Sequence, residues 1–236
     1  MNLLDVKEIC AGYGKSRVLD GLSLEVGEGE AVSILGRNGS GRSTLLKTIM
    51  GALPSSSGSI SFDGGALSGC RPFDVVRKGI AYVPEERLAF KNLTVEENLV
   101  LGQQPARPGS TRWTIAQMYD YFPRLRERRN TLAGYLSGGE QQMLTIARSL
   151  LTNPRLILID EPTEGLAPQI VEVVMKVILD IRRHGVAVIL VEQKLTIALK
   201  IVQRVLIMAH GAIVYNGTPE AFSADSSIRH KWLEVS

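Results

Sequence analysis

A glycine-rich turn between a hydrophobic strand and a helix constrains this chain more than any other feature. The segment EAVSILG, residues 30–36, predicts a buried strand, and STLLKTIMG, residues 43–51, has helical spacing and ends in glycine. Between them the chain reads GRNGSGRST, and three glycines let this backbone wrap closely so that successive N–H groups turn inward: Gly36, Gly39 and Gly41. The following helix adds the positive end of its dipole, so the turn predicts a phosphate site.

The residues at the start of this helix refine the prediction. The Ser43 hydroxyl is placed to ligate Mg²⁺ and the Thr44 hydroxyl to reach an α-phosphate. Arg42 stands where the pattern G-x-x-x-x-G-K-[ST] has lysine, and its guanidinium is longer and broader than an ammonium group. We therefore expect nucleotide binding to survive in weakened form and hydrolysis to be the step most affected. The whole set of loop candidates is Gly36, Arg37, Asn38, Gly39, Ser40, Gly41, Arg42, Ser43 and Thr44.

Two further segments contain residues that are suited to catalysis or to anion binding. LILIDEPTEG predicts a buried strand that ends in Asp160, a carboxylate able to bind Mg²⁺ through water, followed by Glu161, which can polarise an attacking water. LSGGEQQ predicts a second anion site at a helix N-terminus, with Ser137 as the cap and Gly138 and Gly139 behind it. Ser137 lies 23 residues before Asp160, a spacing that makes the combination more specific than either segment alone.

Strand-like and helix-like segments alternate along most of the chain, which predicts an α/β fold. Residues 3–11 and 18–26 predict two antiparallel strands, and VLIMAHGAIVYNGTP predicts a hairpin near the end. The stretch 88–150 differs because it shows helical patterns and no clear strand, including a capping box at Thr94 and an arginine-rich helix over 123–130. We interpret it as a helical subdomain inserted in the α/β core.

The amino-acid composition excludes several classes of protein. The 236 residues are 44% hydrophobic and 22% charged, which is typical of a globular protein and not of a disordered or fibrous one. The net charge of +3 provides no strongly basic surface for nucleic acid. The apolar runs are too short to span a membrane, and the start shows no signal peptide. The two cysteines, Cys10 and Cys70, are expected to be reduced thiols.

The three segments together make the chain resemble the ATP-binding subunits of ABC transporters over nearly its whole length. The resemblance implies one domain, 1–236, with a P-loop NTPase core of the ABC ATPase type, an antiparallel β subdomain and the helical subdomain. It also implies ATP and Mg²⁺ as ligands and a head-to-tail dimer, in which Ser137, Gly138 and Gly139 of one chain complete the nucleotide site of the other. Transmembrane permease subunits would hold the chain at the cytoplasmic face of the membrane and convert ATP hydrolysis into transport.

Three more positions are assigned by the resemblance. Tyr13 stands where the family stacks an aromatic ring on adenine, Glu85 where most members have a glutamine that touches Mg²⁺, and Gln193 where most have a histidine that contacts the γ-phosphate. VPE, VEQ and EGLAP are similar to the second ATP-binding subunit of branched-chain amino-acid importers. This implies import of branched-chain amino acids or a related small polar solute. A second ATP-binding subunit would be a partner, in a hetero- or homodimer, and a solute-binding protein would act only indirectly.

Three other functions compete with this one. Arg42, Ala167 and Gln193 depart from the family pattern and are compatible with a nucleotide-binding regulatory subunit that hydrolyses little ATP. A soluble ABC ATPase of DNA repair or translation is disfavoured, because such proteins usually carry two ATP-binding domains or a long coiled coil. A small-molecule kinase is disfavoured because LSGGEQ has no role in one.

Overall fold

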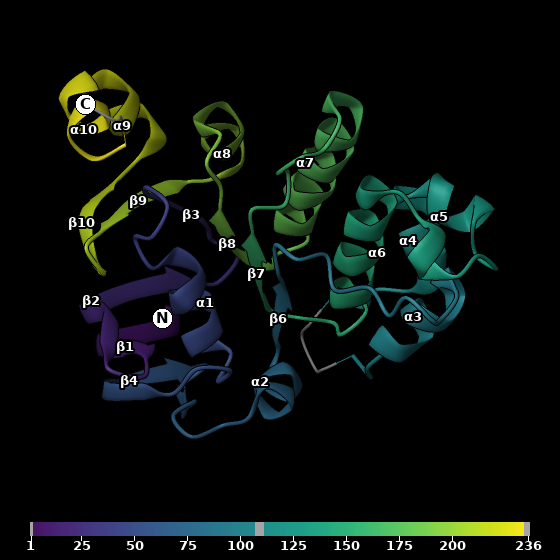
Figure 1. Ribbon diagram of the computed structural model, residues 1–236, viewed down its shortest axis with the longest axis horizontal. Helices are drawn as coiled ribbons and strands as arrows, with labels where there is room; N and C mark the ends of the chain where they lie inside the picture. Colours follow the sequence, from purple (N-terminus) through teal and green to yellow (C-terminus); the bar gives the residue numbers. More distant parts are fainter. Residues whose placement is uncertain (1, 107–110, 234–236) are drawn as a thin grey trace.

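The computed structural model describes residues 2–106 and 111–233, and within these ranges the strands form two sheets with a helical arm beyond the larger one (Figure 1). The view places the smaller sheet and the helical arm on opposite sides of the larger sheet. The α/β fold with an antiparallel subdomain and a helical insertion, predicted from the sequence, is confirmed. Residues 107–110 of the predicted insertion lie outside the described residues.

The smaller sheet is antiparallel and has the order β2-β1-β4-β5. Its strands are β1 (Asn2–Tyr13), β2 (Ser16–Gly27), β4 (Ser55–Phe62) and β5 (Gly65–Ala66). Apolar residues on one face pack with helix α1 (Arg42–Ile49) and with one face of the larger sheet. The predicted antiparallel pair at the start of the chain is confirmed as β1 and β2.

The larger sheet has the order β10-β9-β3-β8-β7-β6 and is parallel except at its β10 edge. Its strands are β3 (Ala31–Leu35), β6 (Ile80–Val83), β7 (Leu156–Asp160), β8 (Ala187–Val191), β9 (Arg204–Ala209) and β10 (Ala212–Gly217). Every residue of β3, β7 and β8 is buried, as expected for parallel strands covered on both faces. The carboxyl ends of these three strands meet at one edge, where α/β folds place their ligands.

Helices pack against the larger sheet, and the chain continues as helices after the last strand of this sheet. The long helix α7 (Pro168–Arg183) and helix α8 (Leu195–Ile201) contribute to the apolar core on one face, together with the helical arm. Near the end of the chain, α9 (Pro219–Ala224) and α10 (Ser226–Trp232) follow β10. These two helices and α2 (Pro72–Lys78) were not predicted, because each spans seven residues or fewer and shows little periodicity.

The helical arm contains α3 (Val95–Gly102), α4 (Ile115–Tyr121), α5 (Pro123–Glu127), the 3₁₀ turn η1 (Ala133–Tyr135) and α6 (Gly138–Leu150). The predicted capping box at Thr94 is confirmed, since its side chain accepts from the backbone of Glu97. The predicted helix over 123–130 is too long: α5 ends at Glu127 because the backbone of Arg128 leaves the helical region (φ −102°, ψ 13°). Its arginines pair locally, with Arg124 on Glu127 and Arg126 on Asp120.

Candidate functional site

A cavity of about 440 Å³ lies at the carboxyl ends of β3, β7 and β8. The glycine-rich turn after β3 forms one wall, and residues that follow β6, β7 and β8 form the others. The lining residues are Val18, Asn38, Gly39, Ser40, Gly41, Arg42, Ser43, Thr44, Glu85, Glu161, Glu164 and Gln193. The sheet topology thus brings into contact side chains that are as much as 155 residues apart in the chain.

At two of its glycines, Gly36 and Gly41, the glycine-rich turn packs too closely against the rest of the chain to leave room for a side chain. A Cβ atom on Gly36 would collide with the Met208 carbonyl oxygen and would lie 2.7 Å from the Ser40 hydroxyl. Gly41 has a left-handed backbone (φ 100°) and stands at the N-cap of α1 without any side-chain cap. The first N–H groups of α1 therefore have no side chain bonded to them from the cap position, and they are available to an anion.

Arg42 points into this site and not into solvent. Its side chain is only 6% exposed, and Nη2 donates to Oε1 of Glu161 at 2.9 Å, forming an ion pair with a carboxylate that is 8% exposed. The same Nη2 lies 3.3 Å from Oδ1 of Asn38. Among the described residues, Nη1 is buried and has no hydrogen-bond partner. A buried donor without a partner is costly, so this atom marks a place for an acceptor such as a phosphate oxygen.

Gln193 completes a ring of hydrogen bonds around Glu161. Its Nε2 donates to both carboxylate oxygens, at 2.9 and 2.7 Å, and also lies 3.2 Å from Oδ1 of Asn38. This contact follows from the sheet order, because β8 lies between β3 and β7 and the residue that follows it lies between their two loops. Glu161 itself has a left-handed backbone (φ 44°), a strained conformation that tends to occur at functional sites.

Asp160 is buried at the end of β7, with 1% of its surface exposed. Burial raises the pKa of this carboxyl, the hydrogen bond from Ser43 acts in the opposite direction, and the nearby Glu161 charge raises the pKa further. Tyr82 on β6 donates to Oδ2 at 3.3 Å, while Oδ1 has no partner in the described part of the chain. A buried carboxylate oxygen and a hydroxyl beside it are suitable ligands for a hard cation such as Mg²⁺.

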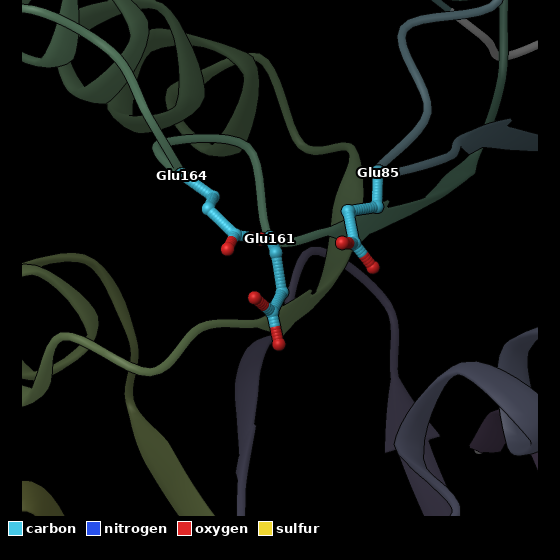
Figure 2. A group of neighbouring side chains, drawn as sticks. All are labelled: Glu85, Glu161 and Glu164. Carbon is cyan, nitrogen blue, oxygen red and sulfur yellow. The ribbon is translucent and has the colours of Figure 1, made fainter. Parts of the chain in front are cut away.

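Three glutamates converge above the glycine-rich turn (Figure 2). One carboxylate oxygen from each of Glu85, Glu161 and Glu164 lies within 4.8 Å of the others. Glu161 is buried, whereas the other two are exposed. Glu164 was not predicted as a site residue, although its presence in the same short turn as Glu161, in EPTEG, could have indicated it.

Other predicted residues lie apart from this cavity. Tyr13 is 52% exposed at the end of β1 and does not line it, nor do Ser137, Gly138 and Gly139. Gly36 and Arg37 line a neighbouring cavity of about 390 Å³ that shares Asn38 and Gln193. The LSGGEQQ segment forms the N-terminus of α6, where Ser137 is exposed and caps the helix. A single chain therefore does not bring its two glycine-rich helix starts to the same cavity.

Arg87 is a further residue that the sequence patterns did not indicate. Its Nη2 donates to the carbonyl of Glu164 at 2.5 Å, and its guanidinium lies beside Gly138, where an added Cβ would collide with Nη1. It thus connects the turn after β7 with the start of α6. Its backbone is left-handed (φ 51°), which could not be anticipated from an arginine in the sequence.

Comparison with known proteins decides the family. Residues 19–164 match the ABC transporter family. The chain belongs to this family. As an ABC protein it is an ATPase subunit of the transporter type and binds ATP or ADP. No helix of the described residues combines the length and the apolar character needed to cross a membrane.

Similar ABC proteins cover nearly the whole chain. The high-affinity branched-chain amino acid transport ATP-binding protein BraG of Pseudomonas aeruginosa is 42% identical, over 98% of this chain and 99% of its own. The lipopolysaccharide export ATP-binding protein LptB of Haemophilus influenzae is 31% identical, over 99% and 98%. A nucleotide-free ATP-binding cassette from an ABC transporter superposes with a TM-score of 0.83 at 27% identity, over 97% of both chains. The ADP conformation of another such cassette has a TM-score of 0.82 at 27% identity, over 98% of both chains.

Proposed function

We propose that this chain hydrolyses ATP to power import of branched-chain amino acids, or of a related small polar solute, through transmembrane partner subunits. The observation that carries the proposal is the cavity that joins the glycine-rich turn to Glu161, the residue directly after Asp160. The choice of solute is supported by relatives. BraG is 42% identical to the chain, against 31% for LptB, whose name refers to a different cargo.

Within the cavity we assign phosphate binding to the loop residues 36–44, through backbone N–H groups and the positive end of α1. Glu161 is assigned as the base that polarises the attacking water, and Gln193 as the residue that positions it. Tyr13 is assigned to the adenine ring, because it is an exposed aromatic side chain and such a ring can stack on a base.

We assign Mg²⁺ to Ser43, Asp160 and Glu85. The fit is supported by the hydrogen bond between Ser43 and Asp160, by the unpartnered Oδ1 of Asp160 and by the position of Glu85 on the cavity wall. When bound, the ion would neutralise phosphate charge. The chain's own contribution is to hold two buried carboxylates, Asp160 and Glu161, side by side at the end of β7.

The N-terminus of α6 is assigned to the nucleotide of a second ATP-binding subunit, in a homo- or heterodimer. In support, Ser137 is exposed and does not line its own chain's cavity, while the first turn of α6 has the character of an anion site. The whole of 1–236 then acts as one ATP-binding domain with the helical subdomain 88–150 inserted in it.

Permease subunits are proposed to dock near Glu85 and the helical arm, which would hold the chain at the cytoplasmic face of the membrane. Exposed apolar side chains gather in this part of the sequence: Leu88, Phe90, Val100 and Leu101. Capture of co-expressed membrane subunits by the wild-type chain and by Glu85→Arg tests the assignment. We expect the variant to capture less, and equal capture would contradict the docking site.

A regulatory subunit with little hydrolysis is the second candidate. The observation that favours it is the Arg42–Glu161 ion pair, because a base held by a buried cation is not free to accept a proton from water. The chain would then bind nucleotide and leave hydrolysis to its partner.

The deciding experiment measures ATP affinity and steady-state hydrolysis with Mg²⁺ for the wild type and for Arg42→Lys. We expect both proteins to bind ATP and the lysine variant to turn over at least about tenfold faster, a barrier change of about 1.4 kcal/mol. Glu161→Gln is the inactive control. If both proteins bind and neither hydrolyses, the regulatory function is favoured. Transport of labelled leucine into vesicles that contain the co-expressed permease tests the solute.

A further inference from the structure

The Arg42 side chain joins two walls of the nucleotide site. The guanidinium is buried against Glu161, and this contact connects the start of α1 to the residue that follows β7. Two charges that face each other at 2.9 Å, both almost removed from solvent, neutralise each other. Removing either partner from such a pair leaves the other one buried without compensation.

Both oxygens of Glu161 are occupied in this arrangement. Oε1 accepts from Arg42 and from Gln193, and Oε2 accepts from Gln193 at 2.7 Å. Asn38 receives donors from the same two side chains, so four residues form a closed ring. Three of the roughly four acceptor positions of this carboxylate are thus occupied, and a water molecule that is to be polarised by Glu161 must compete with these donors.

The shape of arginine allows this ring. A guanidinium carries several N–H donors in a fixed fork and can bond a carboxylate, an amide oxygen and a third acceptor together, whereas an ammonium is a compact charge. Nη2 serves Glu161 and Asn38, and Nη1 is buried with no partner in the described ranges. The group is thus paired on one side and able to accept an anion on the other.

We propose that Arg42 and Glu161 form a latch that closes the nucleotide-free site and that phosphate opens. The proposal rests on the function proposed above. A phosphate group draws the guanidinium toward itself, and Glu161 then loses its buried counter-charge and gains a free acceptor position on Oε1 for water. The latch lowers ATP affinity, since nucleotide must compete with Glu161, and it makes the base available only when phosphate is bound.

The test is a double-mutant cycle on ATP affinity, measured with N-methylanthraniloyl-ATP without Mg²⁺ so that hydrolysis does not interfere. The four proteins are wild type, Arg42→Lys, Glu161→Gln and the double variant. Glu161→Gln should tighten binding about tenfold when Arg42 is present and less than about threefold in the Arg42→Lys background, a coupling within the range seen for contacting residues. An equal effect in both backgrounds overturns the latch.

Glu164→Gln is the matched control, because it removes one carboxylate from the same cavity without touching Arg42. In the wild-type background it should tighten binding less than about threefold, so the contrast with Glu161→Gln does not require any change at Arg42. Equal tightening by the two variants attributes the effect to charge alone and also overturns the latch. If none of the proteins binds the nucleotide, the proposed function fails and the latch with it.

Discussion

Two helices of this protein, α1 and α6, begin with glycine-rich turns, and they differ in how their N-termini are capped. At α6, Ser137 and Glu140 form a reciprocal capping box: Ser137 Oγ accepts from the Glu140 backbone, and Glu140 Oε2 accepts from the Ser137 backbone at 2.8 Å. At α1, the cap is Gly41, which has no side chain to offer. The capping box pairs two backbone donors at the N-terminus of α6, whereas that of α1 has no side-chain cap.

The pKa values of the carboxyl groups beside these two helices, Glu140 and Asp160, are shifted in opposite directions. Partial burial acts to raise the pKa of Glu140, but hydrogen bonds from the backbone and side chain of Ser137 outweigh it, so this pKa is lowered. The pKa of Asp160 is raised, because burial is the largest influence on it. The comparison teaches that the carboxylate of the helical arm is stabilised by its own helix start, whereas the carboxylate at the end of β7 is held in a buried place that disfavours its charge.

The largest expected effect on this comparison comes from Gly36→Ala, in the turn before α1. Its Cβ would collide with a backbone carbonyl and the Ser40 hydroxyl, so the loop must move. We expect ATP affinity to fall about 100-fold, the effect of roughly 3 kcal/mol of overpacking. Gly27→Ala is the control, because its Cβ would meet nothing closer than 3.5 Å. Wild-type affinity in a folded Gly36→Ala protein would show that ATP binding does not depend on close wrapping of the turn.

Ser137→Ala tests the satisfied helix. Loss of the capping box should cost about 1 kcal/mol of unfolding free energy. A thermal melt should show a decrease of roughly 2–4 °C for a chain of this size. ATP affinity of the isolated chain should stay unchanged, because Ser137 does not line the cavity. Weaker ATP binding by the single chain would mean that the two helix starts are not independent.

Asp160→Asn tests the comparison through the pH dependence of the melting temperature. A carboxyl whose pKa is raised in the folded state stabilises the fold when protonated, and this stabilisation is lost as pH rises through that raised pKa. The nucleotide-free variant should therefore melt at a higher temperature than wild type at neutral pH. The difference, about 2 °C, should shrink toward the usual aspartate pKa near 4. A variant that melts lower than wild type at neutral pH would contradict the view that Asp160 is held at a cost.

Much of this arrangement could be predicted from local pattern. The runs at β3, β7 and β8 are apolar enough to require burial on both faces, and the box at Thr94 follows from residue types at fixed spacing. The helix predicted to begin at Ser43 begins one residue earlier, at Arg42. The prediction failed where stability depends on neighbours, as in the early end of α5 at Glu127 and the short helices α2, α9 and α10. Short helices have little periodicity of their own and are stabilised mainly by packing.

The sequence by itself determined that a glycine-rich turn, an acidic strand end and a second helix start exist, because each needs only a few residues in a row. Only the tertiary structure decided how they meet. The order of strands places Gln193 between the two loops, turns Arg42 onto Glu161 and gathers Glu85 and Glu164 on the same wall. These contacts join residues far apart in the chain, and their geometry depends on sheet packing that no local pattern encodes.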